Sequence, residues 1–242
     1  MITFILPIYQ QEHVLEKSIS ALDKFLSIES SEEYEILICN DGSADRCSEI
    51  AEMLEKKYKG VRAIGYKTNR GRGYALKYSG LKARGEYLIS MDCDLIIEEN
   101  FPYIRKMISL VKDYDVVIAT RFHPQAKTER KFIRKFVSRS YRLLVRLIFP
   151  GFPVTDPDVG FKGFKKESFQ QINLVTNLSG PPWDLQFLIN SWHYGHSIYE
   201  FPFSYNENYT KTTVNIFICS LIELMGMLYI RLTFLITKRI VF

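Results

Sequence analysis

Short apolar runs alternate with longer amphipathic segments along the first half of this chain, and this alternation restricts the fold more than any other feature. Four apolar runs of strand length lie at 3–6, 34–39, 61–66 and 87–91. The segments between them, 13–26, 44–58 and 74–83, carry apolar side chains at helical spacing. The pattern continues with a predicted helix over 101–111 and a predicted strand over 115–119. It predicts an α/β fold whose mostly parallel sheet has helices on both faces.

Size and composition agree with one such domain followed by a tail. The 242 residues are enough to bury a sizeable core. With 47% hydrophobic and 14% aromatic residues, the composition excludes a disordered chain. The formal net charge of +5 suits phosphorylated substrates, anionic lipid or nucleic acid. No recognised nucleic-acid module is present, so we expect no nucleic-acid partner.

The four cysteines, Cys39, Cys47, Cys93 and Cys219, are scattered without paired spacing or an accompanying histidine pattern. They indicate reduced thiols and argue against a zinc site or a disulfide framework. No basic-then-apolar signal comes before the first strand-like run. Both observations predict that the functional site of the protein faces the cytoplasm.

Two carboxylates one residue apart, Asp92 and Asp94, directly follow the apolar run 87–91. Alternate side chains of a strand point to the same face, so both can share one target beyond its end, where ligands of open α/β sheets bind. Close carboxylates repel unless a cation lies between them, and Mg²⁺ or Mn²⁺ prefers carboxylate and phosphate oxygens. The pair therefore predicts a divalent metal that holds a diphosphate. The alternative is that it caps the next helix, which begins near 98–102.

Cations are crowded into residues 121–146, with aromatic and leucine side chains among them. On a helix, Arg134, Ser138 and Arg142 would share one face, because residues four apart are neighbours. The segment is interpreted either as a solvated basic face or as a cradle for a phosphorylated substrate or for membrane headgroups.

Residues 214–236 are largely apolar. Their length permits a bilayer span, which needs about 20 residues. However, Glu223 near the centre would be costly in hydrocarbon. An interfacial amphipathic helix, or a helix docked on the sheet, is therefore favoured over a span.

Six short motifs occur in a fixed order along the chain. They are Ile5-Leu-Pro7-Ile-Tyr9, Asn40-Asp41-Gly42-Ser43, Asn69-Arg-Gly71-Arg-Gly73, Asp92-Cys-Asp94-Leu, Ala119-Thr-Arg121-Phe and Asp156-Pro-Asp158-Val-Gly160-Phe-Lys162-Gly-Phe164. Together they resemble family 2 glycosyltransferases of GT-A fold, and most of all the branch that makes dolichyl- or polyprenyl-phosphate mannose and glucose. The resemblance runs from residue 2 to about 211. It implies a catalytic domain over 1–211 and an apolar, helical tail over 212–242 at the membrane interface.

The resemblance implies a nucleotide-sugar donor and a role for most motifs. Pro7 and Tyr9 would line the base and ribose, Asp41 would hydrogen-bond the nucleoside, and the backbone at Gly71 and Gly73 would approach the ligand closely. Asp92 and Asp94 would bind the Mg²⁺ or Mn²⁺ that neutralises the diphosphate. Lys211 would reach the diphosphate too. Asp184 would either face the donor sugar or cap the helix predicted over 185–194.

The implied acceptor is a polyprenyl or dolichyl phosphate. Its phosphate is already an anionic nucleophile, so it needs positioning and charge neutralisation more than a general base. Arg121, with Arg134 and Ser138, would supply both. The expected reaction inverts the configuration at the anomeric carbon. We expect it to take place at the cytoplasmic face of a membrane, with the protein bound there as a peripheral or monotopic protein. A membrane subunit or a second copy of the chain is a candidate partner.

Several residues depart from the family pattern, namely Gln10, Gln11, Asn40, Ile96, Val159 and Gln186. They leave open whether the donor carries GDP or UDP, and which sugar. They also motivate one alternative, a nucleotide-binding scaffold without turnover. A second alternative is a family 2 transferase with a soluble or glycan acceptor. An aspartyl-phosphate phosphatase is disfavoured, because there the acidic pair follows the first strand and not the fourth.

Overall fold

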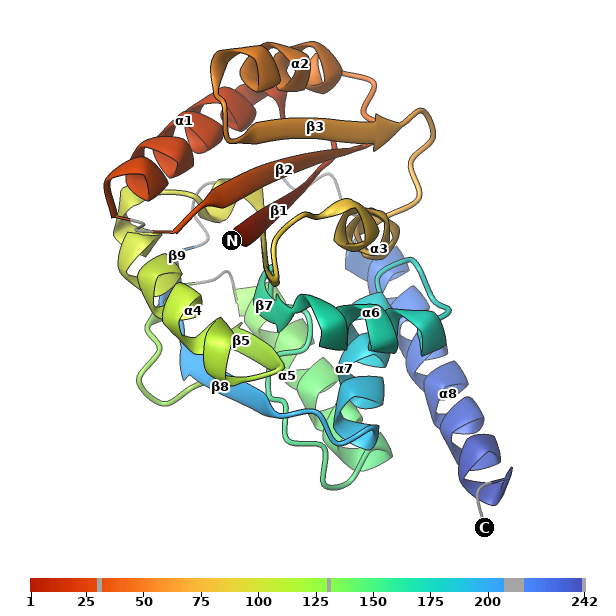
Figure 1. Cartoon of the computed structure of the whole chain (residues 1–242). Coiled ribbons are helices and arrows are strands. Elements are labelled where there is room, and N and C mark those ends of the chain that lie inside the picture. The colour runs from red at the N-terminus through yellow and green to blue at the C-terminus, as the bar shows by residue number, and fades with distance from the viewer. Residues whose placement is uncertain (30–31, 130–131, 207–215, 241–242) are drawn as a thin grey trace.

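The central sheet of this computed structural model has seven strands, and the structure describes residues 1–29, 32–129, 132–206 and 216–240. The strands run in the order β3-β2-β1-β4-β7-β5-β8 (Figure 1). Their bounds are β1 Ile2–Ile8, β2 Tyr34–Asp41, β3 Val61–Tyr66, β4 Tyr87–Met91, β5 Val116–Thr120, β7 Phe161–Lys165 and β8 Ile198–Pro202. A separate parallel pair joins β6, Thr128–Glu129, to β9, Tyr205–Asn206.

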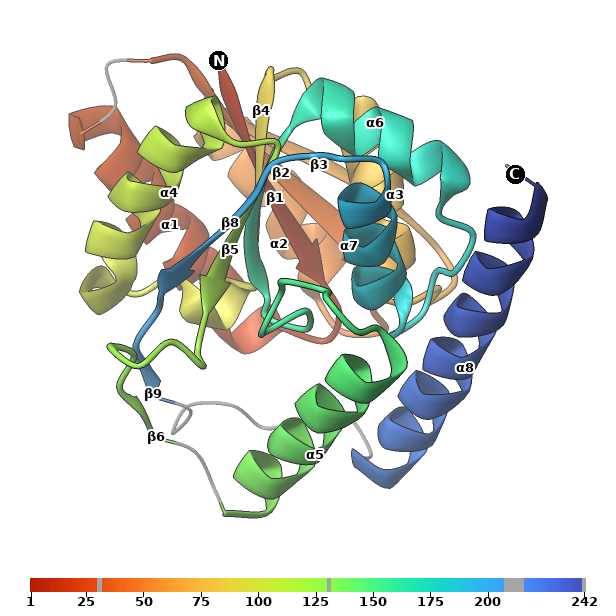
Figure 2. The same ribbon diagram turned by 90° about the horizontal axis from the view of Figure 1, so that it is seen from below.

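Helices cover both faces of this sheet. Helices α1 and α4 lie on one side of it, and α3, α6 and α7 lie on the other (Figure 2). The helices are α1 Glu12–Glu29, α2 Cys47–Lys57, α3 Arg72–Lys82, α4 Phe101–Asp113, α5 Phe132–Ile148, α6 Lys166–Val175, α7 Trp183–His193 and α8 Ile216–Ile240. Short 3-10 turns, Cys93–Leu95 and Glu98–Asn100, connect β4 to α4. The predicted mostly parallel α/β sheet with a C-terminal apolar helix is confirmed.

One strand, β7, runs antiparallel to both of its neighbours, β4 and β5. Because it runs in the opposite direction, β7 begins at the edge of the sheet where the parallel strands end. The residues just before it, 156–160, are therefore brought beside the ends of β4 and β5. This strand was not predicted, since its sequence Phe-Lys-Gly-Phe-Lys resembles neither a continuous apolar run nor a regular amphipathic strand.

Helices α5 and α8 lie side by side beyond the carboxyl edge, toward which the arrowheads of β1 and β5 point (Figure 2). The inner face of α8 follows helical spacing through Glu223, Gly226, Met227 and Ile230. Met227 and Ile230 are buried. Within the parts of the chain that the structure describes, no helix is both long enough and apolar enough to cross a membrane. The burial of Met227 and Ile230 shows that α8 is docked on the domain through one face.

Candidate active site

Polar and charged side chains gather at the carboxyl edge of the sheet. Asp41 ends β2, Asp92 follows β4 directly, and Arg121 follows β5 directly. The antiparallel β7 brings Asp156 to the same edge, where its carboxylate contacts Arg121, and Asp184 enters from the first turn of α7. The edge is therefore formed by segments that are far apart in the sequence, as expected for a ligand site in an open α/β sheet.

Asp92 fits tightly against the segment before β7. Its backbone N–H donates to the carbonyl oxygen of Gly160 at 3.1 Å. A Cβ atom at position 160 would come within 1.7 Å of Asp92 Oδ2, so only glycine leaves room for this carboxylate. Its other oxygen, Oδ1, accepts a hydrogen bond from Arg72 Nε at 3.0 Å.

Neither member of the acidic pair takes the N-cap position of the next helix, α4. Asp92 precedes the 3-10 turn 93–95 and makes no side-chain capping bond, and Asn100 takes the N-cap position of α4. Asp94 lies within that turn, and both carboxylates are partly exposed. The capping alternative is wrong, because the chain turns away after β4 and starts α4 several residues later.

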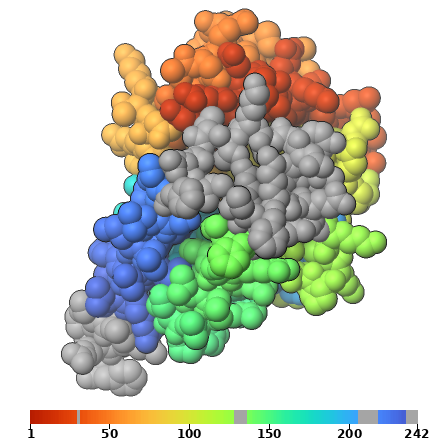
Figure 3. All heavy atoms as spheres, turned by 180° about the vertical axis from the view of Figure 1, so that it is seen from behind, coloured from red at the N-terminus to blue at the C-terminus, as the bar shows by residue number. Residues whose placement is uncertain are grey.

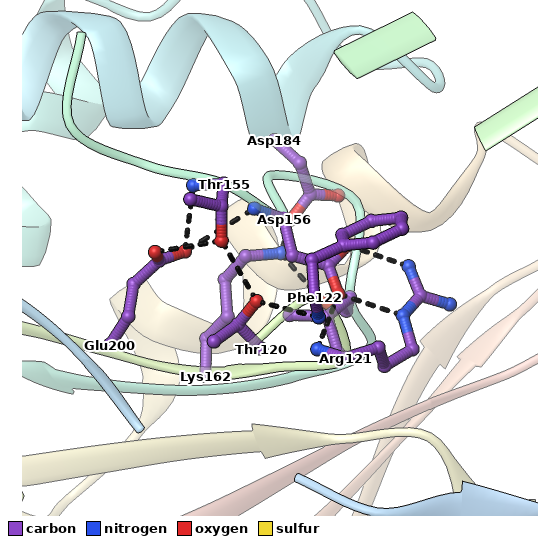
Figure 4. A network of polar contacts seen from close by, with 9 residues as sticks. Thr120, Arg121, Phe122, Thr155, Asp156, Lys162, Asp184 and Glu200 are labelled. Carbon is purple, nitrogen blue, oxygen red and sulfur yellow. Dashed lines mark hydrogen bonds and ion pairs between the residues drawn. The ribbon is translucent and has the colours of Figure 1, made fainter. Parts of the chain in front are cut away.

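A network of ion pairs extends from Asp92 into the core. Arg72 Nη1 donates to Asp184 Oδ2 at 2.7 Å, so this guanidinium bridges two carboxylates. Lys162 is 1% exposed, and its Nζ donates to Asp184 Oδ1 at 2.6 Å and to the carbonyl oxygen of Val159 at 2.7 Å. Figure 4 shows Lys162 reaching toward Asp184 from β7. A buried lysine is stable only with such partners.

These cations set the charge of Asp184. Burial alone would raise the pKa of its carboxyl, but Arg72 and Lys162 together hold that pKa below its usual range. Asp158, an exposed residue of the segment before β7, has its pKa raised by desolvation and by the negative charge of Asp184, against the attraction of Lys162. Asp184 is thus an ionised acceptor of hydrogen bonds.

Arg121 is oriented by Asp156. Its Nε and Nη2 donate to the two oxygens of Asp156 at 2.8 and 2.7 Å, and its backbone N–H donates at 2.9 Å (Figure 4). Glu200 of β8 in turn accepts from the backbone N–H groups of Thr155 and Asp156. Burial would raise the pKa of the Asp156 carboxyl, but Arg121 holds it below its usual range. The two-bond geometry fixes the plane of this guanidinium at the edge of the sheet.

The predicted nucleotide residues lie around the end of β2. Asp41 is 3% exposed and accepts from Asn69 Nδ2 at 3.1 Å and from the backbone N–H of Arg70 at 2.8 Å. It thereby holds the glycine-rich turn against β2. Gly71 is the N-cap of α3 with a φ of 87°, and Gly73 in the first turn packs against Trp183.

The remaining predicted residues are placed less centrally or not described. Pro7 is partly exposed within β1, and Tyr9 is 37% exposed just after it. Ser138 is partly exposed on α5. The side chain of Arg134, and Lys211 as a whole, lie outside the residues that the structure describes.

Several residues of this network were not predicted. Arg72 and Lys162 lie within motifs that the sequence analysis had identified, but only their tertiary partners show their roles. Glu223 of α8, whose Oε2 accepts a hydrogen bond from Tyr141 Oη of α5, was interpreted only as an obstacle to membrane insertion. The available signal was its position on the buried stripe of a helix, where an apolar residue is expected.

The arrangement combines a partly exposed acidic pair, a glycine-rich turn held against the end of β2 by Asp41, and an arginine fixed by Asp156. In fold, the chain is similar to the Mycobacterium tuberculosis glucosyl-3-phosphoglycerate synthase solved with Mn²⁺, uridine-diphosphate-glucose and phosphoglyceric acid. The TM-score is 0.70 at 16% identity, over 96% of this chain and 79% of that one. The fold is therefore that of the GT-A glycosyltransferases.

The sequence comparisons define the family. The profile described as Glycosyl transferase family 2 matches residues 3–172, and the chain belongs to this family. It is 28% identical over 214 residues to the dolichyl-phosphate beta-glucosyltransferase ALG5A of Trichomonas vaginalis, covering 85% of this chain and 66% of that protein. It is 30% identical over 176 residues to a dolichol-phosphate mannosyltransferase of Pyrococcus furiosus, covering 72% and 48%. The chain thus spans between about half and two thirds of these relatives.

Proposed function

We propose that this protein transfers a hexose from a nucleoside-diphosphate sugar to a dolichyl or polyprenyl phosphate at a membrane surface. The observation that supports it best is that Asp92, just after β4, and Arg121, just after β5 and fixed by Asp156, share one edge of the sheet in a family 2 chain. Relatives named for dolichyl-phosphate glucose and mannose transfer support the acceptor class. Within this proposal, residues 1–211 form the catalytic domain and 212–242 the interfacial tail.

The donor would lie along the ends of β1, β2 and β4. Pro7 and Tyr9 would contact the base and ribose, and Asp41 would hold the nucleoside. The backbone at Gly71 and Gly73 would adjoin the diphosphate, with Lys211 as a further contact. Asp184, ionised between its two cations, would accept hydrogen bonds from sugar hydroxyls.

A divalent metal fits the acidic pair. No cluster of three or more acidic, histidine or cysteine side chains placed to hold a metal is found within the described residues. Mg²⁺ in nucleotide sites typically takes one or two carboxylates and completes its shell with phosphate oxygens and water. Asp92 and Asp94, both partly exposed, match that donor set, and a bound Mg²⁺ or Mn²⁺ would neutralise charge on the leaving diphosphate.

The acceptor phosphate would meet cations from β5 and α5. Arg121 is fixed by Asp156, and the Arg142 guanidinium lies 4.7 Å from the ring centre of the adjacent Phe122. Burial and the neighbouring Arg146 and Arg139 lower the pKa of Arg142, so an anion placed there would be attracted. A phosphate oxygen would form the new bond to the anomeric carbon, and the nucleoside diphosphate would leave with the electron pair of the broken bond.

The surface of α5 and α8 supports the membrane location. Large apolar side chains stand exposed on both helices, namely Phe136, Leu143, Leu144 and Leu147 of α5, and Ile218, Leu221, Ile222, Leu224, Met225, Leu228 and Leu232 of α8. Arg139 and Arg146 of α5 are exposed among them. Figure 3 shows the blue α8 beside the green of α5 on one face of the molecule. Apolar side chains mixed with arginines suit the headgroup region of an anionic membrane. All four cysteines are free thiols, which suits the cytoplasmic face of the membrane, because the cytoplasm keeps thiols reduced.

A donor screen tests this proposal. The purified chain is incubated with polyprenyl phosphate, Mn²⁺ or Mg²⁺, and radiolabelled GDP-mannose or UDP-glucose, and label is counted in the lipid phase. We expect one donor to label lipid, and Asp94→Ala to abolish the label. Label on a free sugar or glycan acceptor instead of lipid would support the alternative transferase. Binding of nucleotide without any transfer would support the scaffold.

A further inference from the structure

Helix α8 docks through a narrow stripe that begins with a carboxyl group. A Cβ at Gly226 would come within 2.3 Å of Pro182, so the helix backbone lies directly on the N-cap of α7. One turn further on, Tyr229 Oη accepts from Asn177 Nδ2 at 2.6 Å. Glu223, one turn before Gly226, lies on the same face. It therefore points toward the first turn of α7, where Asp184 lies.

The carboxyl group of Glu223 contacts α5 and lies within electrostatic range of the candidate site. Its Oε2 accepts a hydrogen bond from Tyr141 Oη of α5 at 3.2 Å. The negative charges of Asp158 and Asp184 act on Glu223, and the same two carboxyls act on Tyr141. The titratable groups that face it are Tyr141 of α5, Asp158 before β7, Lys162 of β7, Asp184 of α7 and Cys219 of α8 itself.

We propose that Glu223 is a positioning residue of the active site. Through Tyr141 and its place beside Asp158 and Asp184, it joins the C-terminal helix to the carboxylate that faces the donor sugar. This inference rests on the proposed function and adds to it. The docked tail is part of the catalytic apparatus, in addition to contacting the membrane.

The energetics favour a functional role over simple packing. Burial, followed by the charges of Asp158 and Asp184, raises the pKa of Glu223 to about 9, so it is uncharged at neutral pH. A leucine at this position of the stripe would pack against α5 and α7 without placing a carboxyl beside two others. A carboxyl group whose pKa is strongly shifted by neighbouring carboxylates indicates function when those neighbours belong to a candidate site. Because protonated Glu223 carries no charge, it also adds no electrostatic repulsion against an anionic acceptor.

Three variants of the full chain test this role. Glu223→Leu removes the polar contact, Glu223→Gln keeps an uncharged hydrogen-bonding group, and Glu167→Gln makes the same chemical change at an exposed position of α6. We expect Glu223→Leu to fold, with a Tm equal to or above that of the wild type, and to lose about tenfold or more in kcat. Its KM for the acceptor should change less. Glu223→Gln should restore transfer to within about threefold, and Glu167→Gln should match the wild type.

Transfer by Glu223→Leu at the wild-type rate would overturn the inference. A loss of activity that only follows a loss of folded protein would overturn it as well. If the wild-type chain transfers no sugar to lipid, the proposed function fails, and a second measurement still tests the placement of Glu223.

That measurement is the pH dependence of Tm. Since the folded-state pKa of Glu223 is raised above its unfolded value, its contribution to stability is complete below about pH 4.5 and is lost as the pH rises to about 9. Glu223→Gln lacks this titration, so its Tm should rise relative to the wild type between pH 5 and pH 9. Parallel Tm curves for the two proteins would show that Glu223 does not lie in this cluster.

Discussion

Arg72 lies between the two acidic sides of the site, with Nε 3.0 Å from Asp92 Oδ1 and Nη1 2.7 Å from Asp184 Oδ2. Its third nitrogen, Nη2, is buried without a hydrogen-bond partner. The two carboxylates raise the pKa of Arg72 against the effect of burial, so it stays charged. The Asp92 carboxylate, which would hold a divalent metal, is thus already paired with the Arg72 guanidinium.

This contact predicts the effect of Arg72 on metal affinity. In Arg72→Gln, the loss of a positive charge beside Asp92 should tighten Mn²⁺ binding to the nucleotide-free protein by about threefold to tenfold, because like charges repel at this distance. Arg70→Gln, an exposed neighbour on the same turn, is the control. Titration followed by the electron spin resonance of free Mn²⁺ measures both. Unchanged or weaker binding in Arg72→Gln would contradict the expectation.

Gly160 predicts a second effect. A methyl group there would come within 1.7 Å of Asp92 Oδ2, so Gly160→Ala must move either the carboxylate or the start of β7. We expect transfer to fall by about a hundredfold, since displacements of this size can misplace a reacting group. Gly180→Ala is the control, because its nearest neighbour would be Pro182 Cδ at 3.9 Å, an ordinary contact. Comparable activity of the two variants would show that the position of Asp92 does not matter.

A comparison of the predicted and the observed roles of individual residues shows how far the sequence could predict this site. Asp92 was found because a local pattern, an apolar run that stops at a carboxylate, coincides with the end of a buried strand. Strand β7 was missed because Lys162 breaks its apolar pattern, and the partner that permits its burial, Asp184, is 22 residues away. Arg72 was missed for the same reason, since one of its carboxylate partners is 112 residues away. Local signals predict elements, whereas long-range ion pairs need the fold.

Pro7 gives a further example. The first apolar run was predicted over 3–6, just before this proline, yet β1 continues to Ile8 with Pro7 in register with Cys39. A proline cannot donate to a ladder and is tolerated where one side of a strand lacks a partner. Strand β1 pairs with β4 only as far as Ile5, so at Pro7 it has one neighbour, β2. No local pattern predicts where a neighbouring strand stops.

The exposed leucines of α5 and α8 predict membrane binding. Leu147 of α5 is 69% exposed and Leu228 of α8 is 51% exposed, so a bilayer interface would bury apolar area on both. At about 25 cal/mol per Å², partial burial of a leucine contributes on the order of 1 kcal/mol, or about fivefold in affinity. We expect Leu147→Gln and Leu228→Gln each to weaken sedimentation with vesicles of phosphatidylcholine and phosphatidylserine by about that factor. Leu174→Gln is the matched control, because Leu174 is 87% exposed on α6 and belongs to neither helix. If Leu174→Gln weakens vesicle binding as much as the other two, the surface of α5 and α8 is not the one that meets the membrane.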